Sequence, residues 1–231
     1  MALQTAVLFG LAASSALVVV GAAGAYWGPP EELVGVVLAL SSGALITALT
    51  FDLFEPAYES GGAWLASGGL FAGAIAFTAI KWWLQQSSGD GNSGAALLAS
   101  VTLDGIPENL ALGTALIGGA EGGLAILVAI FLSNLPEAVG GSKDMDNRGF
   151  SELEAVGAWA GVGVLLAGAV VVGATVFAGF GESAVALARA FAGGAVLAGV
   201  AIEILPDAYD EGGPGVALAT AVGFVVTFVL K

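Results

Sequence analysis

Two short segments of this 231-residue chain each place a proline beside a glutamate inside a strongly apolar stretch. They read Asp104-Gly105-Ile106-Pro107-Glu108-Asn109 and Ser133-Asn134-Leu135-Pro136-Glu137-Ala138. A proline inside a helix removes one amide donor and displaces the carbonyl four residues earlier, here that of Leu103 or Leu132. Freed carbonyl oxygens beside carboxylates can bind a cation, and in hydrocarbon such groups are tolerated only inside protein or along a watery cavity. Two copies therefore predict a cation pathway.

Helical spacing defines a candidate metal site within these segments. Asp104 and Glu108 are four residues apart and share one helix face, as Ser133 and Glu137 do on the second segment. Asn134 adds an amide oxygen, whereas Asn109 points about 100° away from Glu108 in a regular helix. Three carboxylates buried without an ion are unfavourable by about 9 kcal/mol together. A divalent cation would offset this, as would protonation of the empty site; protonated carboxyls that only join helices are the structural alternative.

The composition predicts an all-α integral membrane protein. The chain is 58% hydrophobic and 10% charged, with a mean hydropathy of +0.95, far more apolar than a soluble domain. We expect eight spans in a 3+2+3 arrangement, because stretches of about 17 to 25 apolar residues can cross a bilayer. The expected spans are 5–27, 33–54, 63–84, 95–118, 122–142, 153–179, 184–205 and 214–231. The first could be a secretory signal, but no Lys or Arg precedes it.

The residue types that are missing limit the chemistry. The chain has no cysteine and no histidine, which removes thiolate ligands, disulfides and the commonest metal ligand. Its net charge of −14 excludes nucleic acid as a partner and is typical of a solvated acidic surface adapted to high salt. Any ion-binding chemistry must use oxygen ligands, and nothing indicates an organic cofactor.

An internal repeat organises the rest of the chain as a single transmembrane domain, 1–231. The segment 43–62 aligns without gaps to 194–213, with matching acid, tyrosine and glycine positions. The two copies lie five spans apart and must cross the membrane in opposite directions. We therefore expect inverted repeats over about 1–84 and 153–231 around central motif helices over about 95–142. Inverted repeats with broken helices at the centre are typical of secondary transporters.

The same repeat predicts polar steps on both sides of the central site. Asp52 and Glu55 lie toward the outer face, and Glu203 and Asp207 toward the inner face, as candidate pathway residues that would concentrate cations. Three further acids are interpreted as a charged membrane border: Glu59, Asp210 and Glu211. Orientation follows from the cations. Lys81, Lys143 and Arg148 fall near connections of one face and Arg189 and Lys231 near the other, which predicts both termini outside the cell.

The motifs Ile106-Pro107-Glu108, Leu110-Ala111-Leu112-Gly113 and Leu135-Pro136-Glu137 resemble the signature helices of the ZIP family of divalent metal transporters, particularly its prokaryotic branch. The resemblance extends over nearly the whole chain. It implies movement of zinc, iron, manganese or a related ion toward the cytoplasm through a site between the fourth and fifth spans. It also implies a homodimer in the cytoplasmic membrane, and an elevator-like motion of four helices against a scaffold that contains spans two and seven.

The chain departs from the family pattern in ways that bear on the ion. By position, the family's metal-binding histidine falls on Asp104 and its asparagine on Gly105, while the glutamate is kept as Glu108. The polar pair of the fifth span falls on Ser133 and Asn134, and its acid on Glu137. Between Glu154 and Glu182 no acid is present where some relatives hold a second metal, which argues against a binuclear site.

Three alternatives remain open at this stage. Zinc accepts carboxylate ligands, but an all-oxygen site also suits manganese, iron(II) or magnesium. Another inverted-repeat exchanger, moving calcium or sodium against protons, is the main competitor to a ZIP-like transporter. An intramembrane enzyme with paired glutamates as acid and base would need a further nucleophile or electrophile, so we expect no enzyme.

Overall fold

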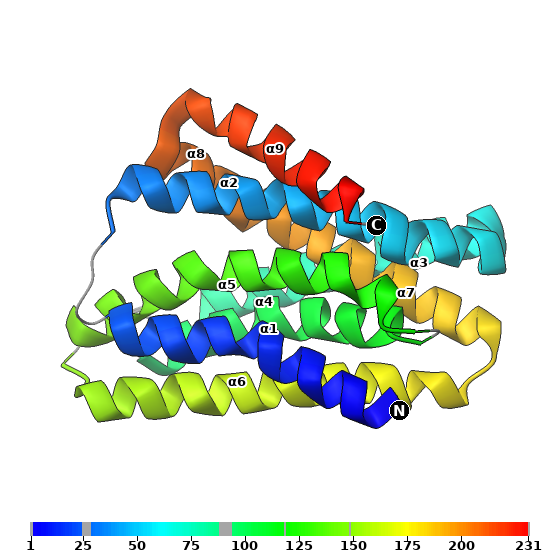
Figure 1. Cartoon of the computed structure of the whole chain (residues 1–231), viewed down its shortest axis with the longest axis horizontal. Helices are drawn as coiled ribbons and strands as arrows, with labels where there is room; N and C mark the ends of the chain where they lie inside the picture. Colours follow the sequence, from blue (N-terminus) through cyan, green and yellow to red (C-terminus); the bar gives the residue numbers. More distant parts are fainter. Residues whose placement is uncertain (1, 25–28, 88–93, 118, 148, 231) are drawn as a thin grey trace.

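Helices make up nearly all of the chain in the computed structural model, which describes residues 2–24, 29–87, 94–117, 119–147 and 149–230 (Figure 1). Over these residues there is no strand. The long helices are α1 (Ala2–Gly24), α2 (Glu31–Ala48), α3 (Glu55–Ser87), α4 (Gly94–Ala115), α5 (Glu121–Asn147), α6 (Glu152–Thr175), α7 (Glu182–Gly199) and α9 (Val216–Val229). Shorter elements complete the order: α8 (Leu205–Gly212), the π-helical η1 (Leu49–Phe54) and η3 (Val200–Ile204), and the 3₁₀ turns η2 (Phe177–Gly179) and η4 (Gly213–Gly215).

The prediction of an all-α membrane protein is confirmed. Five helical stretches of the described chain are long and apolar enough to cross a bilayer: Leu3–Gly21, Glu31–Gln86, Gly123–Ser142, Glu152–Gly179 and Glu182–Val229. The second and fifth contain 56 and 48 residues, far more than the roughly 20 that one crossing needs. α4, which carries Asp104 and Glu108, is not among them. The count of eight spans therefore stays a prediction.

A glycine with positive φ divides each of the two longest stretches. Gly62 has φ 76° and ψ 170°, and Gly213 has φ 63° and ψ −164°. Both values lie in a region that is open essentially to glycine alone. The two residues are paired in the sequence repeat, and η1 and η3 precede them at matching places. In Figure 1, α2 and α7 run in opposite directions.

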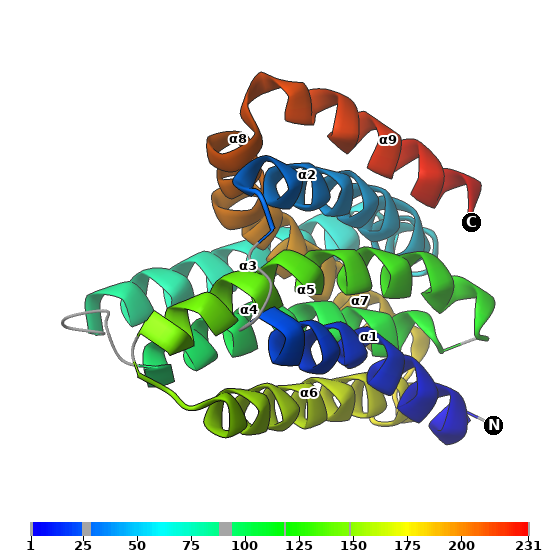
Figure 2. The same ribbon diagram turned by 60° about the vertical axis from the view of Figure 1, so that its left-hand side comes forward.

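The helices form two groups. The central bundle comprises α1, α4, α5 and α6, which pack on one another; the repeat bundle comprises α2, α3, α7, α8 and α9. Figures 1 and 2 both show α1, α5 and α6 on one side of the molecule and α2, α8 and α9 on the other. The bundles meet where α2 packs on α5 and α4 on α7. The largest cluster of buried apolar side chains extends across this junction.

Glycines allow the closest helix crossings in the repeat bundle. A Cβ atom on Gly43 of α2 would lie 1.9 Å from the Thr220 carbonyl oxygen of α9, and one on Gly194 of α7 would lie 1.9 Å from that of Leu70 on α3. Gly43 and Gly194 are paired in the repeat. Small residues let membrane helices approach this closely, so both halves use the same contact.

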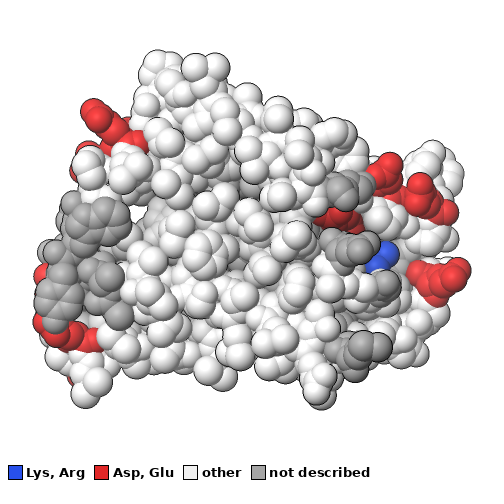
Figure 3. Space-filling view, in the orientation of Figure 1, with Lys and Arg blue, Asp and Glu red and all other residues white. Residues whose placement is uncertain are grey.

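On one face of the molecule, the exposed charged side chains lie toward its two ends. Figure 3 shows red acidic atoms at its left and right ends, with none on the visible face between them. Such a distribution suits a protein whose middle lies in hydrocarbon. Arg189 of α7 donates hydrogen bonds to the Thr114 and Ile117 carbonyls, at 2.9 and 3.0 Å, and so satisfies the end of α4. Two other cations used for orientation, Arg148 and Lys231, lie outside the described residues.

Candidate metal site

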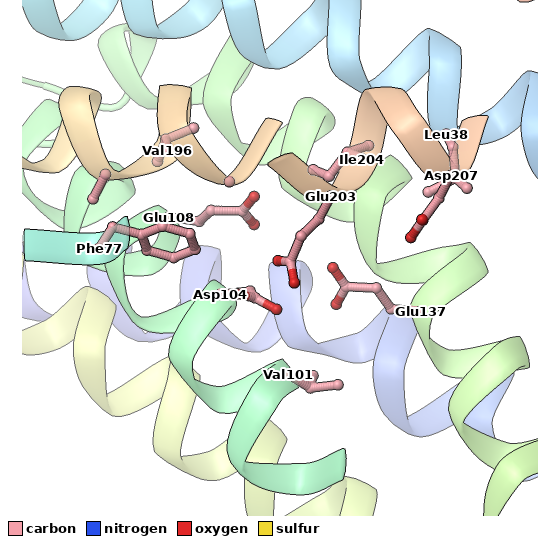
Figure 4. Close-up of a pocket in the computed structure, with 12 residues that line it drawn as sticks. Leu38, Phe77, Val101, Asp104, Glu108, Glu137, Val196, Glu203, Ile204 and Asp207 are labelled. Atoms are coloured by element: carbon pink, nitrogen blue, oxygen red, sulfur yellow. The ribbon is translucent and has the colours of Figure 1, made fainter. Parts of the chain in front are cut away.

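A pocket of about 180 Å³ lies at the junction of the two bundles, and five acidic side chains line it. Asp104 and Glu108 come from α4, Glu137 from α5, Glu203 from η3 and Asp207 from α8. Figure 4 shows the carboxylates of Asp104, Glu137 and Glu203 directed toward one another. We call this the acidic pocket. It brings together the predicted acids of the central site and two of the predicted pathway residues.

Helical geometry explains how the central acids reach the pocket. Asp104 and Glu108 are one turn apart and therefore project from the same face of α4. Glu108 is only 7% exposed. Both α4 and α5 continue as helices through Pro107 and Pro136, so neither helix is broken as is typical of secondary transporters. Neighbouring helices can support a proline within a membrane helix. The irregular segments lie instead at η1 and η3 of the repeat bundle.

Lys81 of α3 forms ion pairs with two acids of the pocket. Its Nζ donates to both carboxylate oxygens of Asp104, at 3.1 Å each, and also pairs with Glu203. The side-chain exposures are 5% for Lys81, 20% for Asp104 and 27% for Glu203. The orientation prediction counted Lys81 among the cations near connections, but its side chain is buried and paired within the bundle. A single lysine within the predicted span 63–84 was the available signal, because ionisable groups inside membranes are rare.

The polar residues beside the central acids are buried and bonded elsewhere. The Ser133 hydroxyl donates to the Ile130 carbonyl at 3.0 Å and lies beside the Glu108 carboxylate. The Asn134 amide donates to the Ala13 carbonyl of α1 at 3.1 Å. Neither residue lines the acidic pocket in this conformation.

Asn109 differs from these residues because one of its polar atoms is unused. It is fully buried, and its amide nitrogen donates to the Gly105 carbonyl at 2.9 Å. Its Oδ1 atom has no hydrogen-bond partner among the described residues. An amide oxygen of this kind is unfavourable in a low-dielectric interior. It leaves one acceptor of α4 available to a ligand or a rearranged neighbour.

The predicted outer pathway residues do not reach the pocket. Asp52 lies on η1 and is buried, and Glu55 at the start of α3 is exposed. The acidic pocket includes neither residue. Glu203 and Asp207 therefore line the pocket from the second repeat, while the acids of the first repeat remain outside it.

A second cavity of about 340 Å³ continues the acidic pocket toward the end of the molecule. The two share Leu38, Val101, Glu137 and Asp207. The second cavity adds Glu31 and Glu211, and it lies beside the start of α2 and along α8, at the end opposite the marked termini (Figure 1). The acids thus lie along two adjoining cavities, the second of which lies nearer one end of the protein.

The acidic pocket is not a preformed metal centre. Within the described part of the chain, no group of three or more acidic side chains is arranged so that it could hold a metal ion. Ammonium and carboxylate groups already pair there. Binding of an ion would therefore require side chains to rearrange.

Two comparisons with known proteins gave different results. No protein-family profile matches the chain. It is similar to a protein of Arabidopsis thaliana named "Putative zinc transporter", with 27% identity over 199 residues. The similarity covers 81% of this chain but only 32% of the plant protein, so the chain spans about a third of that relative's length. This similarity supports the predicted resemblance to the ZIP transporters.

Proposed function

We propose that the chain is a membrane transporter for a divalent metal cation, not an enzyme, and that the cation is its substrate. The supporting observation is the acidic pocket, where Asp104, Glu108 and Glu137 of the central bundle face Glu203 of the repeat bundle. Burying these carboxylates in a membrane protein is unfavourable unless they bind a cation, pair with a cationic side chain or are protonated, so their number favours a cation site. The similarity to a zinc transporter supports metal transport in general.

The bound ion is held between α4 and α5 by oxygen ligands. Asp104, Glu108 and Glu137 supply carboxylates, and Ser133 and Asn134 complete the site once their side chains turn away from the helix carbonyls. Zinc is the first candidate because of the named relative. Manganese, iron(II) and magnesium compete with it, since the chain has no histidine or cysteine and these ions favour oxygen ligands.

Transport proceeds by movement of the central bundle against the repeat bundle, in an elevator-type motion. Two observations support this motion. The pocket lies at the junction of the bundles, and the matching irregular segments η1 and η3 lie in oppositely directed helices. With both termini outside the cell, the end of the protein that holds the second cavity faces the cytoplasm. In the conformation that is open to the outside, Asp52, Glu55 and Asn109 line the ion pathway. In the present conformation, Glu203 and Asp207 line it. We propose the cytoplasmic membrane and a homodimer, as the resemblance implies.

Neutral substitutions of the central acids test this function. Purified protein in liposomes should take up Zn²⁺ or Mn²⁺, and Glu108→Gln or Glu137→Gln should lower the initial rate by about 100-fold or more, because each removes a metal ligand. Glu59→Gln, at an exposed site, is the matched control and should retain uptake. Folding is checked by gel filtration. Uptake that survives both substitutions would rule out this site.

Two further measurements identify the ion and the class of transporter. Anomalous scattering from crystals soaked in several metals should place density between Asp104, Glu108, Asn134 and Glu137. A flux panel that includes Ca²⁺ and Na⁺ separates a ZIP-like transporter from another cation exchanger. Transport of Ca²⁺ or Na⁺ in preference to transition metals would favour the second class.

A further inference from the structure

Lys81 places its ammonium group where the carboxylates of the two bundles meet. It bonds Asp104 on α4 and Glu203 on η3 at the same time, and it is 4% exposed. The acids of the proposed metal site are thus already partly neutralised by a cation that belongs to the chain. Among the described residues, no three acids are arranged to hold a metal while this pairing exists.

The physical need for such a cation follows from the low dielectric of the site. Carboxylates gathered in a membrane protein repel one another, and removing their partner leaves uncompensated buried charge. A lysine ammonium is a compact charge with three donors on a flexible stem, so it can satisfy acids on two helices and still withdraw. An arginine would dissociate from the carboxylates less readily, because its planar guanidinium binds a carboxylate through two parallel hydrogen bonds.

We propose that Lys81 is a tethered counter-cation that occupies the acidic pocket in the absence of metal and that an incoming divalent ion displaces. This inference rests on the proposed transport function and adds a specificity-determining residue to it. A monovalent ion that replaces the ammonium brings no additional positive charge to the carboxylates. A divalent ion brings one more positive charge than the ammonium that it replaces. Lys81 therefore selects for divalent over monovalent cations and weakens divalent binding by the competition it offers.

The same exchange links ion binding to the contact between the bundles. While Lys81 is in place, it joins α4 of the central bundle to η3 of the repeat bundle. A metal bound to Asp104 and Glu108 breaks this link, because the Asp104 carboxylate then binds the metal and no longer accepts hydrogen bonds from the Lys81 ammonium. Ion binding thereby releases α4 from η3, which the proposed motion requires.

Equilibrium binding of Mn²⁺ to the purified full chain tests this proposal, with free Mn²⁺ measured by electron paramagnetic resonance. Lys81→Gln and Lys81→Met should each bind Mn²⁺ at least tenfold more tightly than the unmodified chain, because no ammonium has to be displaced. Added Na⁺ should weaken Mn²⁺ binding to both variants and leave the unmodified chain unaffected. Glu59→Gln changes one charge at an exposed site outside both cavities and should bind like the unmodified chain.

The outcomes separate this proposal from the function on which it rests. If the unmodified chain binds Mn²⁺ and both Lys81 variants bind it equally well or less well, the counter-cation role is wrong while the metal site stands. If the unmodified chain binds neither Mn²⁺ nor Zn²⁺, the proposed function fails and takes this inference with it. Should the variants be unstable without metal, Mn²⁺ should restore their Tm; no recovery would contradict replacement of Lys81 by metal.

Discussion

The two irregular segments η1 and η3 have related sequences and backbones but different surroundings. Each is a π-helical stretch that carries one acid, Asp52 or Glu203, and each is followed by a positive-φ glycine, Gly62 or Gly213. Asp52 is buried outside the acidic pocket. Glu203 lines that pocket, is 27% exposed in its side chain and pairs with Lys81.

In the proposed transport motion, this difference would let one local structure serve two sides of a membrane. The backbone of each segment is set by its own sequence, whereas access to water depends on how the central bundle lies against it. In the observed conformation Glu203 and Asp207 of the second repeat line the acidic pocket, whereas Asp52 and Glu55 of the first repeat line neither cavity. An inverted pair of such segments can exchange these roles when the central bundle moves. The comparison leads to three predictions.

The largest expected effect concerns the glycine contacts that both halves share. Gly43→Ala and Gly194→Ala should each lower the free energy of unfolding by about 3 kcal/mol or more, the upper range for overpacking, because the new Cβ meets a backbone carbonyl that cannot rotate away. At about 2 to 4 °C per kcal/mol, Tm should fall by about 10 °C in both. Gly157→Ala is the control, since nothing lies within 4 Å of its added Cβ. Unequal losses would show that the two halves do not pack alike.

An intermediate effect concerns water access to the two acids. The chain has no cysteine, so single cysteines can be labelled selectively. A hydrophilic thiol reagent should modify Glu203→Cys about tenfold or more faster than Asp52→Cys, because thiol reactivity depends on exposure.

Paired tyrosines provide the control for this labelling. Tyr58 and Tyr209 are matched in the repeat and are 52% and 57% exposed. Cysteines at these two positions should react at similar rates. Equal rates at Glu203→Cys and Asp52→Cys would mean that the two sides do not differ in access.

The smallest effect concerns the two turns. Gly62→Ala and Gly213→Ala should each lower the free energy of unfolding by about 1 to 2 kcal/mol through backbone strain alone, since no atom lies within 4 Å of either added Cβ. Thermal unfolding should show similar losses in both halves. Gly68→Ala, within α3 and also without neighbours, should cause none. A stable Gly62→Ala beside a destabilised Gly213→Ala would mean that only the second turn is needed.

Much of the fold and part of the site could be predicted from local sequence. Apolar composition requires helices in a membrane, because unpaired backbone groups are unfavourable in hydrocarbon. Four-residue spacing put Asp104 and Glu108 on one face of a helix, and the structure confirms that they line the same pocket. The repeat alignment paired Gly62 with Gly213, and both glycines have positive φ.

Tertiary structure alone decided which groups meet. No local pattern brings Lys81 to Asp104 and Glu203, because the three side chains come from separate helices whose packing places them together. The continuity of α4 and α5 through their prolines, and the difference in access between Asp52 and Glu203, also depend on neighbouring helices. Local sequence sets the conformation of each segment, but the position of a charge and its contact with water depend on the distances between segments.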